Sequence, residues 1–214
     1  MMTLEDLVNH NDPAWHLVQE WQQQATNSIE TLPKNPQQAE QTLLAMQVTT
    51  RSTLGAIIYE TGGILINHGW LRILGSGSER LNRSLDTWNQ QTQSDGFLLI
   101  ADDVVGGYFA INGGALEGNL GDVFYFAPDT LAWESLNIGY SDFIYWVFCG
   151  AIDQFYANFY WKNWQQDIAN LTTDEVFSFM PFLWTAESKS IENVSKKVVP
   201  ILEDFKFKQS LITL

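Results

Sequence analysis

Two adjacent carboxylates, Asp102 and Asp103, are the residues whose type and spacing first suggest chemistry. Paired aspartates can bind Mg²⁺ or Ca²⁺, but these cations require further oxygen ligands that converge on one point. The pair follows an apolar run and precedes Val-Val-Gly-Gly. Aspartate is equally favoured in such a turn, because its side chain accepts hydrogen bonds from nearby backbone N–H groups. The sequence therefore favours a turn, and we predict no metal site.

Cys149 and the three histidines could also do chemistry. Cys149 has no charged neighbour among the six residues before it, whereas a nucleophilic cysteine needs a lowered pKa and a base within hydrogen-bond reach. His10, His16 and His68 fit neither HExxH nor another metal-binding spacing. We therefore predict no catalytic residue and no cofactor, and we favour a binding protein over an enzyme.

A glycine-serine loop offers a possible anion site. It lies between a predicted strand and a predicted helix, where backbone N–H groups can receive an anion, and three arginines are close by in sequence. Neither GxGxxG nor the Walker pattern is present, so a serine-capped helix with solvated arginines is the favoured interpretation. The alternative is a small-molecule or anion site formed by Arg72, Ser76, Gly77, Ser78, Arg80 and Arg83.

The charge balance is strongly acidic. The chain has 25 Asp and Glu against 11 Lys and Arg, a net charge of −14, and no Lys or Arg occurs from Ala101 to Trp161. Such a surface repels phosphate backbones, which argues against nucleic-acid binding. It would raise the encounter rate with a basic protein. Acidity that only maintains solubility is the other explanation, and composition leaves both open.

Aromatic residues are abundant enough to supply both a core and a docking surface. Tyr and Trp are the usual anchors of protein interfaces, although packing against the C-terminal segment is slightly favoured for any single one of them. We predict an acidic, aromatic face that binds a basic protein partner and includes Asp102, Asp103, Asp122, Trp133, Glu134, Tyr156, Tyr160, Trp161 and Trp164.

A β-meander must position these residues. Four apolar runs of strand length are separated by Gly-, Asn-, Asp- and Pro-rich breaks, which is typical of consecutive antiparallel strands. They are Phe97–Ala101, Tyr108–Ile111, Val123–Ala127 and Leu131–Ile138. An aromatic helix capped at Ser141-Asp142 and bent or broken at Gly150 is predicted to follow.

Helices are predicted around this sheet. Asp12-Pro13 opens one that runs to Pro33, Asn35-Pro36 opens a second, and a third spans Ser52–Glu60 and ends at Gly62-Gly63. Ile64–Asn67 and Trp70–Leu74 are predicted strands, and Ser78 is predicted to cap a helix carrying Leu81, Leu85 and Trp88. Near the C-terminus, Val198–Leu202 is a predicted docking strand, with Phe205 and Phe207 as anchors.

Length and composition are those of one domain, 1–214. The single cysteine excludes an internal disulfide and suits a reducing compartment. The longest uncharged apolar run, Phe143–Ile152, has 10 residues, far short of the roughly 20 that a membrane span needs. We expect a cytoplasmic protein that binds neither membranes nor nucleic acid.

Several different glycine- and tryptophan-rich motifs lie between about Leu54 and Trp184. They are Thr61-Gly62-Gly63-Ile64-Leu65, Gly69-Trp70-Leu71-Arg72-Ile73-Leu74-Gly75-Ser76-Gly77, Ala101-Asp102-Asp103 with Gly106-Gly107, Gly121-Asp122-Val123-Phe124-Tyr125-Phe126-Ala127-Pro128-Asp129, and Pro181-Phe182-Leu183-Trp184. Together they resemble a bacterial family of uncharacterised proteins, domain of unknown function 2625. That family supplies no established catalytic residues to transfer.

The order of helices, Gly-Gly turn, strands, Asp-Asp hairpin and aromatic helix is similar, more distantly, to the SUKH superfamily. Many members of that superfamily are immunity proteins that bind bacterial toxins, and others are regulatory interaction domains. The resemblance implies a SUKH-like α+β fold, with a central, mainly antiparallel sheet (meander at about 97–138) and helices packed against it. Because SUKH domains are usually shorter, it implies a SUKH-like core at about 12–164 and a C-terminal extension at about 165–214. It also implies an interaction protein, of which an immunity protein is one form. The sequence leaves the oligomeric state open, and a homodimer is one alternative.

Overall fold

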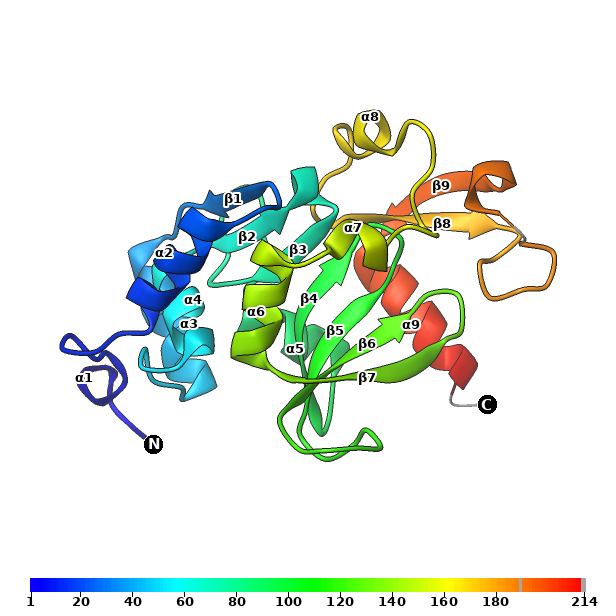
Figure 1. The fold of residues 1–214 in the computed structure, drawn as a ribbon. Helices are drawn as coiled ribbons and strands as arrows, with labels where there is room; N and C mark the ends of the chain where they lie inside the picture. Colours follow the sequence, from blue (N-terminus) through cyan, green and yellow to red (C-terminus); the bar gives the residue numbers. More distant parts are fainter. Residues whose placement is uncertain (189, 213–214) are drawn as a thin grey trace.

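A seven-stranded antiparallel sheet, with its strands in sequence order, forms the centre of the computed structural model, which describes residues 1–188 and 190–212 (Figure 1). The strands are β1 (Ile29–Leu32), β2 (Gly63–Ile66), β3 (Leu71–Leu74), β4 (Phe97–Asp103), β5 (Tyr108–Asn112), β6 (Asp122–Ala127) and β7 (Ala132–Gly139). A separate antiparallel pair joins β8 (Glu175–Met180) to β9 (Ser195–Pro200).

Helices cover both faces of the sheet. They are α1 (Leu4–Leu7), α2 (Trp15–Gln24), α3 (Pro36–Met46), α4 (Thr53–Glu60), α5 (Leu85–Thr92), α6 (Tyr140–Cys149), α7 (Ile152–Phe155), α8 (Trp164–Ile168) and α9 (Ile201–Ile212), with 3₁₀ turns η1 (Asn67–Gly69) and η2 (Ile191–Asn193). Neighbouring residues of a strand point to opposite faces. On β5, Phe109 contacts Phe143 of α6 and Tyr108 contacts Phe205 of α9, so these helices lie on opposite sides. The predicted α+β class is confirmed.

The predicted meander is confirmed. Strands β4 to β7 coincide with the four apolar runs to within about two residues and pair consecutively. Each break between them supplies residues that tolerate a turn. The predicted strands around 64–67 and 70–74 are β2 and β3.

Two of the predicted helix starts are correct. The Asn35 side chain accepts a hydrogen bond from the Gln38 backbone N–H at 3.2 Å, with proline at the first helical position of α3. The Ser52 side chain caps α4 in the same way through the Gly55 N–H at 3.0 Å. These signals depend only on residues within one turn, which is why the sequence reveals them.

Other boundaries differ from the predictions. The first helix does not run to Pro33, because Ile29–Leu32 is strand β1, paired with β2; Ala14, not Asp12, is the N-cap of α2. Gly62-Gly63 does not cap α4, since Thr61 already leaves the helix in an extended conformation and Gly63 begins β2.

Three further predictions need correction. Ser78 caps no helix, because it forms a short bridge with Leu81, and α5 starts after Ser84. The aromatic helix α6 starts at Tyr140, with Gly139 as N-cap; its predicted end at Gly150 is confirmed. The C-terminal strand β9 stops at Pro200 and is followed by the unpredicted helix α9, which buries Phe205 and leaves Phe207 exposed.

The C-terminal segment packs directly on the sheet. The backbone N–H of Phe177 in β8 donates to the carbonyl of Val104 at 2.8 Å. Helix α9 contacts α5, β8 and β9. Among the described residues, no helix is long and apolar enough to cross a membrane.

Candidate functional site

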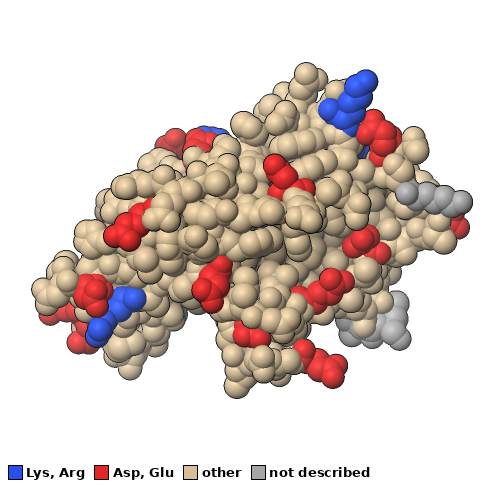
Figure 2. Space-filling model, in the orientation of Figure 1, with Lys and Arg blue, Asp and Glu red and all other residues tan. Residues whose placement is uncertain are grey.

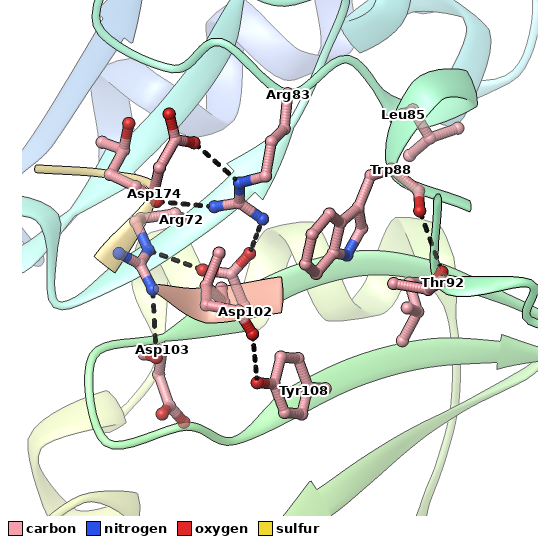
Figure 3. A network of polar contacts seen from close by, with 12 residues as sticks. Arg72, Arg83, Leu85, Trp88, Thr92, Asp102, Asp103, Tyr108 and Asp174 are labelled. Atoms are coloured by element: carbon pink, nitrogen blue, oxygen red, sulfur yellow. Dashed lines mark hydrogen bonds and ion pairs between the residues drawn. The ribbon is translucent and has the colours of Figure 1, made fainter. Parts of the chain in front are cut away.

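A buried ion-pair network lies where β3, β4 and the start of β8 meet (Figure 3). Arg72 on β3 is directly opposite Asp102 on β4 in the register of the sheet. Arg72 Nε donates to Asp102 Oδ1 at 2.5 Å, and Arg83 Nη1 donates to Asp102 Oδ2 at 2.6 Å. All three side chains are at least nine-tenths buried. One carboxylate thus bridges two guanidinium groups away from water.

The remaining contacts of the two arginines connect the sheet to the C-terminal segment. Arg72 Nη1 donates to the Glu175 carbonyl at 2.7 Å. Arg83 donates to the Asp174 carboxylate at 3.2 Å and to the Thr173 carbonyl at 2.8 Å. Burial by itself would lower the pKa of Arg83, but the charges and hydrogen bonds of Asp102 and Asp174 together outweigh burial and raise that pKa. Arg83 therefore stays charged inside the protein.

Asp103 is satisfied in a different way. Its Oδ1 accepts backbone N–H bonds from Val105 at 3.1 Å and Gly107 at 2.7 Å, as the predicted turn requires. Its Oδ2 accepts the hydroxyl groups of Tyr125 at 2.8 Å and Tyr156 at 3.1 Å. Burial raises the pKa of Asp103, and the hydrogen bonds from Gly107, Tyr125 and Tyr156 oppose that shift.

A third buried carboxylate, Asp204 of α9, lies beside the same turn. It pairs with Lys208 at 2.8 Å and accepts the hydroxyl of Tyr108 at 2.8 Å, while Lys208 also donates to the Gly106 carbonyl at 2.8 Å. A Cβ at Gly106 would lie 2.0 Å from Lys208 Nζ, and one at Gly107 would lie 2.3 Å from the Tyr125 hydroxyl oxygen. The Gly-Gly pair is therefore required by the charged groups around it.

The network explains how the chain can bury charge and still keep its acidic surface. Among the described residues, three carboxylates and three cations are buried: Asp102, Asp103 and Asp204, with Arg72, Arg83 and Lys208. Removing equal numbers of both signs leaves the remaining side chains with the full net charge of −14. Through contacts with one another, with buried tyrosines and with the backbone, these groups hold β3, β4, the turn after β4 and α9 together.

The residues that first suggested chemistry, the carboxylates, the histidines and Cys149, can be compared with the structure. No group of three or more His, Cys, Asp or Glu side chains in residues 1–188 and 190–212 could hold a metal ion. Cys149 is half-buried, its thiol donates to the Trp21 carbonyl at 3.6 Å, and burial raises the pKa of the thiol. The protonated form is a poor nucleophile.

The structure divides the predicted partner-binding residues. Asp102, Asp103, Tyr156 and Trp161 are buried in the core, so they cannot belong to an exposed face. This corrects the prediction: the carboxylates are held by arginines, tyrosines and the turn, and the two aromatic rings contact Trp70. The members at least partly exposed are Asp122, Trp133, Glu134, Tyr160 and Trp164.

An acidic face nevertheless exists. Figure 2 shows acidic side chains, and among the described residues no basic ones, over α6, α7 and β7. The carboxylates of the cation-free segment that remain at least partly exposed are Glu117, Asp122, Asp129, Glu134, Asp142 and Asp153. We call these six residues the acidic face.

The predicted ligand-binding residues do not form one site. Arg72 and Arg80 line a cavity of about 130 Å³ together with His68, Thr172 and Thr173. The buried Ser76 bonds to the Thr61 carbonyl, and it lines a different groove of about 400 Å³ with Gly77 and Ser78. Arg83 forms ion pairs with Asp102 and Asp174. Arg72 and Arg80 therefore line one cavity, and the glycine-serine loop lines another.

Sequence reasoning missed the partners that complete the buried network. Asp204 and Lys208 lie at i and i+4, on the same helical face as the buried Ile201 and Phe205. Charged residues at apolar positions of a periodic pattern are the signal that could have revealed them. Asp174 carries no comparable local signal.

Fold and site together define an α+β protein with a structural core of buried ion pairs and an acidic exterior face. The chain belongs to the family described as protein of unknown function DUF2625, whose model matches residues 4–204. A putative uncharacterized protein YbfG of Escherichia coli (strain K12) is 47% identical over 205 residues, covering 95% of this chain and 94% of that protein. An uncharacterized protein of Haemophilus influenzae (strain ATCC 51907 / DSM 11121 / KW20 / Rd) is 44% identical over 207 residues, covering 94% and 91%.

Proposed function

We propose that this protein is a non-enzymatic interaction domain that binds a basic protein through the acidic face. An immunity protein that engages a basic toxin domain is the particular form that the SUKH resemblance favours, and it would act in the cytoplasm. The observation that carries the proposal is the separation of charge. Figure 2 shows acidic side chains and no described basic ones over α6, α7 and β7, and the segment 101–161, which has no Lys or Arg, keeps six carboxylates at least partly exposed.

Such a face acts at a distance. Clustered charge of one sign creates a potential that steers an oppositely charged partner and raises the association rate. Because exposed charges are screened by salt within roughly 10 Å at 0.1 M ionic strength, binding should weaken as salt rises.

The proposal can be tested by affinity purification from the native host with a matched pair of triple variants. Asp129→Asn, Glu134→Gln and Asp142→Asn together neutralise part of the acidic face. Glu40→Gln, Glu79→Gln and Glu203→Gln change the net charge by the same amount elsewhere. We expect the wild type and the second variant, but not the first, to retain one basic protein that salt elutes. Equal recovery by both variants, or an acidic partner, would count against the proposal.

A small-anion site is the second candidate function, because Arg72 lines the cavity of about 130 Å³ from a buried position and the exposed Arg80 lies at the same cavity. Arg72 makes three hydrogen bonds to described residues, whereas a guanidinium carries five N–H donors. Inorganic phosphate should then raise the melting temperature of the wild type and not of Arg80→Gln. An identical response of the two proteins would exclude this candidate.

A further inference from the structure

Asp153 on α7 is an exposed carboxylate that is nevertheless held in place. Its Oδ1 accepts hydrogen bonds from Asn67 Nδ2 at 3.0 Å and from the Tyr160 hydroxyl at 2.9 Å. Asn67 is itself fixed, since its own Oδ1 accepts the Ser28 N–H at 3.3 Å. Among the described residues, none donates to Asp153 Oδ2. The result is an oriented carboxylate with one oxygen open to a partner.

Next to this carboxylate is a rigid pair of aromatic rings. Tyr160 and Trp164 stack with ring centroids 4.7 Å apart and planes 11° from parallel. Both rings meet Trp70 edge to face, at 4.6 Å and 5.1 Å, and Trp70 is fully buried. Tyr160 and Trp164 are themselves only half-buried. Because their positions are fixed before any partner arrives, contact with them costs little conformational entropy.

A carboxylate beside stacked aromatic rings is suited to a guanidinium group. Arginine can donate to the carboxylate while its flat, weakly hydrated head packs against an aromatic ring, and lysine lacks that planar head. The same aromatic cluster already accepts a cation within the molecule, since Lys196 Nζ lies 4.8 Å from the centroid of the Trp161 ring. Trp, Tyr and Arg are also the residues that dominate interface hot spots.

We propose that Asp153 and the Tyr160–Trp164 stack form the anchor for one arginine side chain of the basic partner. This inference rests on the proposed function and makes it more specific. The acidic face as a whole attracts positive charge, and this anchor distinguishes arginine from lysine. The discrimination comes from a carboxylate oriented by Asn67 and Tyr160, together with an adjacent aromatic surface.

The test uses two fluorescently labelled nine-residue peptides, oligo-arginine and oligo-lysine, titrated into the full-length protein and followed by anisotropy. We expect the wild type to bind oligo-arginine about 5-fold more tightly, the effect of one partly exposed cation–π contact and one charge-assisted hydrogen bond. Asp153→Asn keeps the shape of the side chain, and Trp164→Leu removes the stack. Each should abolish the preference while oligo-lysine affinity falls by about 2-fold at most.

Glu134→Gln is the matched control, because it removes one exposed carboxylate of the acidic face that lies outside the anchor. It should weaken both peptides equally and leave the preference intact. Equal affinities in the wild type, or a preference that survives in Asp153→Asn, would overturn the anchor and leave the proposed function standing. If neither peptide binds, both proposals fail. Thermal melts identify any misfolding of Trp164→Leu, and Asp153→Asn decides in that case.

Discussion

Neutralising the carboxylate between the two buried arginines is the most direct test of the network. Asp102→Asn preserves the shape of the side chain and removes its charge, which leaves Arg72 and Arg83 with exposed fractions of 1% and 6% and without their shared counterion. Breaking a buried ion pair by removing one partner costs about 3–5 kcal/mol. A typical domain has only about 5–15 kcal/mol of total stability, so the variant should lose a large part of its free energy of unfolding.

Asp174→Asn is the control variant for this prediction. Asp174 also pairs with Arg83, at 3.2 Å, but its side chain is 40% exposed. A pair open to solvent contributes about 0–1 kcal/mol. Both variants remove one negative charge next to Arg83. They differ in burial and in the second partner of Asp102, the buried Arg72.

Thermal unfolding followed by circular dichroism measures both changes. At about 2–4 °C per kcal/mol for a chain of this size, Asp102→Asn should lower the melting temperature by roughly 6–20 °C and Asp174→Asn by a few degrees at most. Equal losses in the two variants would refute the reasoning, because they would mean that Asp102 is no better shielded from water than Asp174.

Other predictions concern the tight turn and the buried tyrosines. Gly106→Ala should destabilise by about 2 kcal/mol more than Gly121→Ala in urea unfolding: both glycines have positive φ, 78° and 84°, but only at Gly106 would a Cβ meet other atoms within 4 Å. Burial, with the neighbouring carboxylate adding to it, raises the pKa of Tyr125 well above 10. The stability contributed by its neutral form is therefore complete below the unfolded pKa of about 10 and is lost at about 1.4 kcal/mol per pH unit above it. Because Tyr125→Phe removes this contribution, the free energy of unfolding of the variant should fall less steeply between about pH 10 and 11, by that amount. Tyr140→Phe should leave the melting temperature unchanged or raise it, since the buried Tyr140 hydroxyl has no hydrogen-bond partner among the described residues, whereas Tyr125→Phe at neutral pH should cost about 1–3 kcal/mol by removing a donor to Asp103.

The sequence predicts elements well where the determining residues are close together. Strands β4 to β7 and the starts of α3 and α4 depend on turn and capping residues within a few positions. Strand β1 could not be predicted in that way. Its four residues continue a helical pattern, and they become a strand because β2, more than 30 positions away, offers an unpaired edge.

The buried network was out of reach for the same physical reason. The contact of Arg72 with the Glu175 carbonyl joins residues 103 positions apart. From sequence, the clustered arginines suggested a ligand site, and the Asp-Asp pair suggested either a turn or a docking surface. In the folded protein Arg72 and Arg83 are counterions of Asp102. Only the pairing of β3 with β4 brings these opposite charges together.

Solubility and recognition are different explanations of an acidic surface, and they predict different geometry for a carboxylate such as Asp153. Carboxylates that only keep a protein soluble can point freely into water and lie anywhere on the surface. Asp153 is instead fixed by a side-chain amide and a tyrosine hydroxyl from two different parts of the chain. Ordering an exposed carboxylate costs conformational entropy and adds nothing to solubility. It does lower the cost of binding a cation at that point, so the arrangement at Asp153 favours recognition.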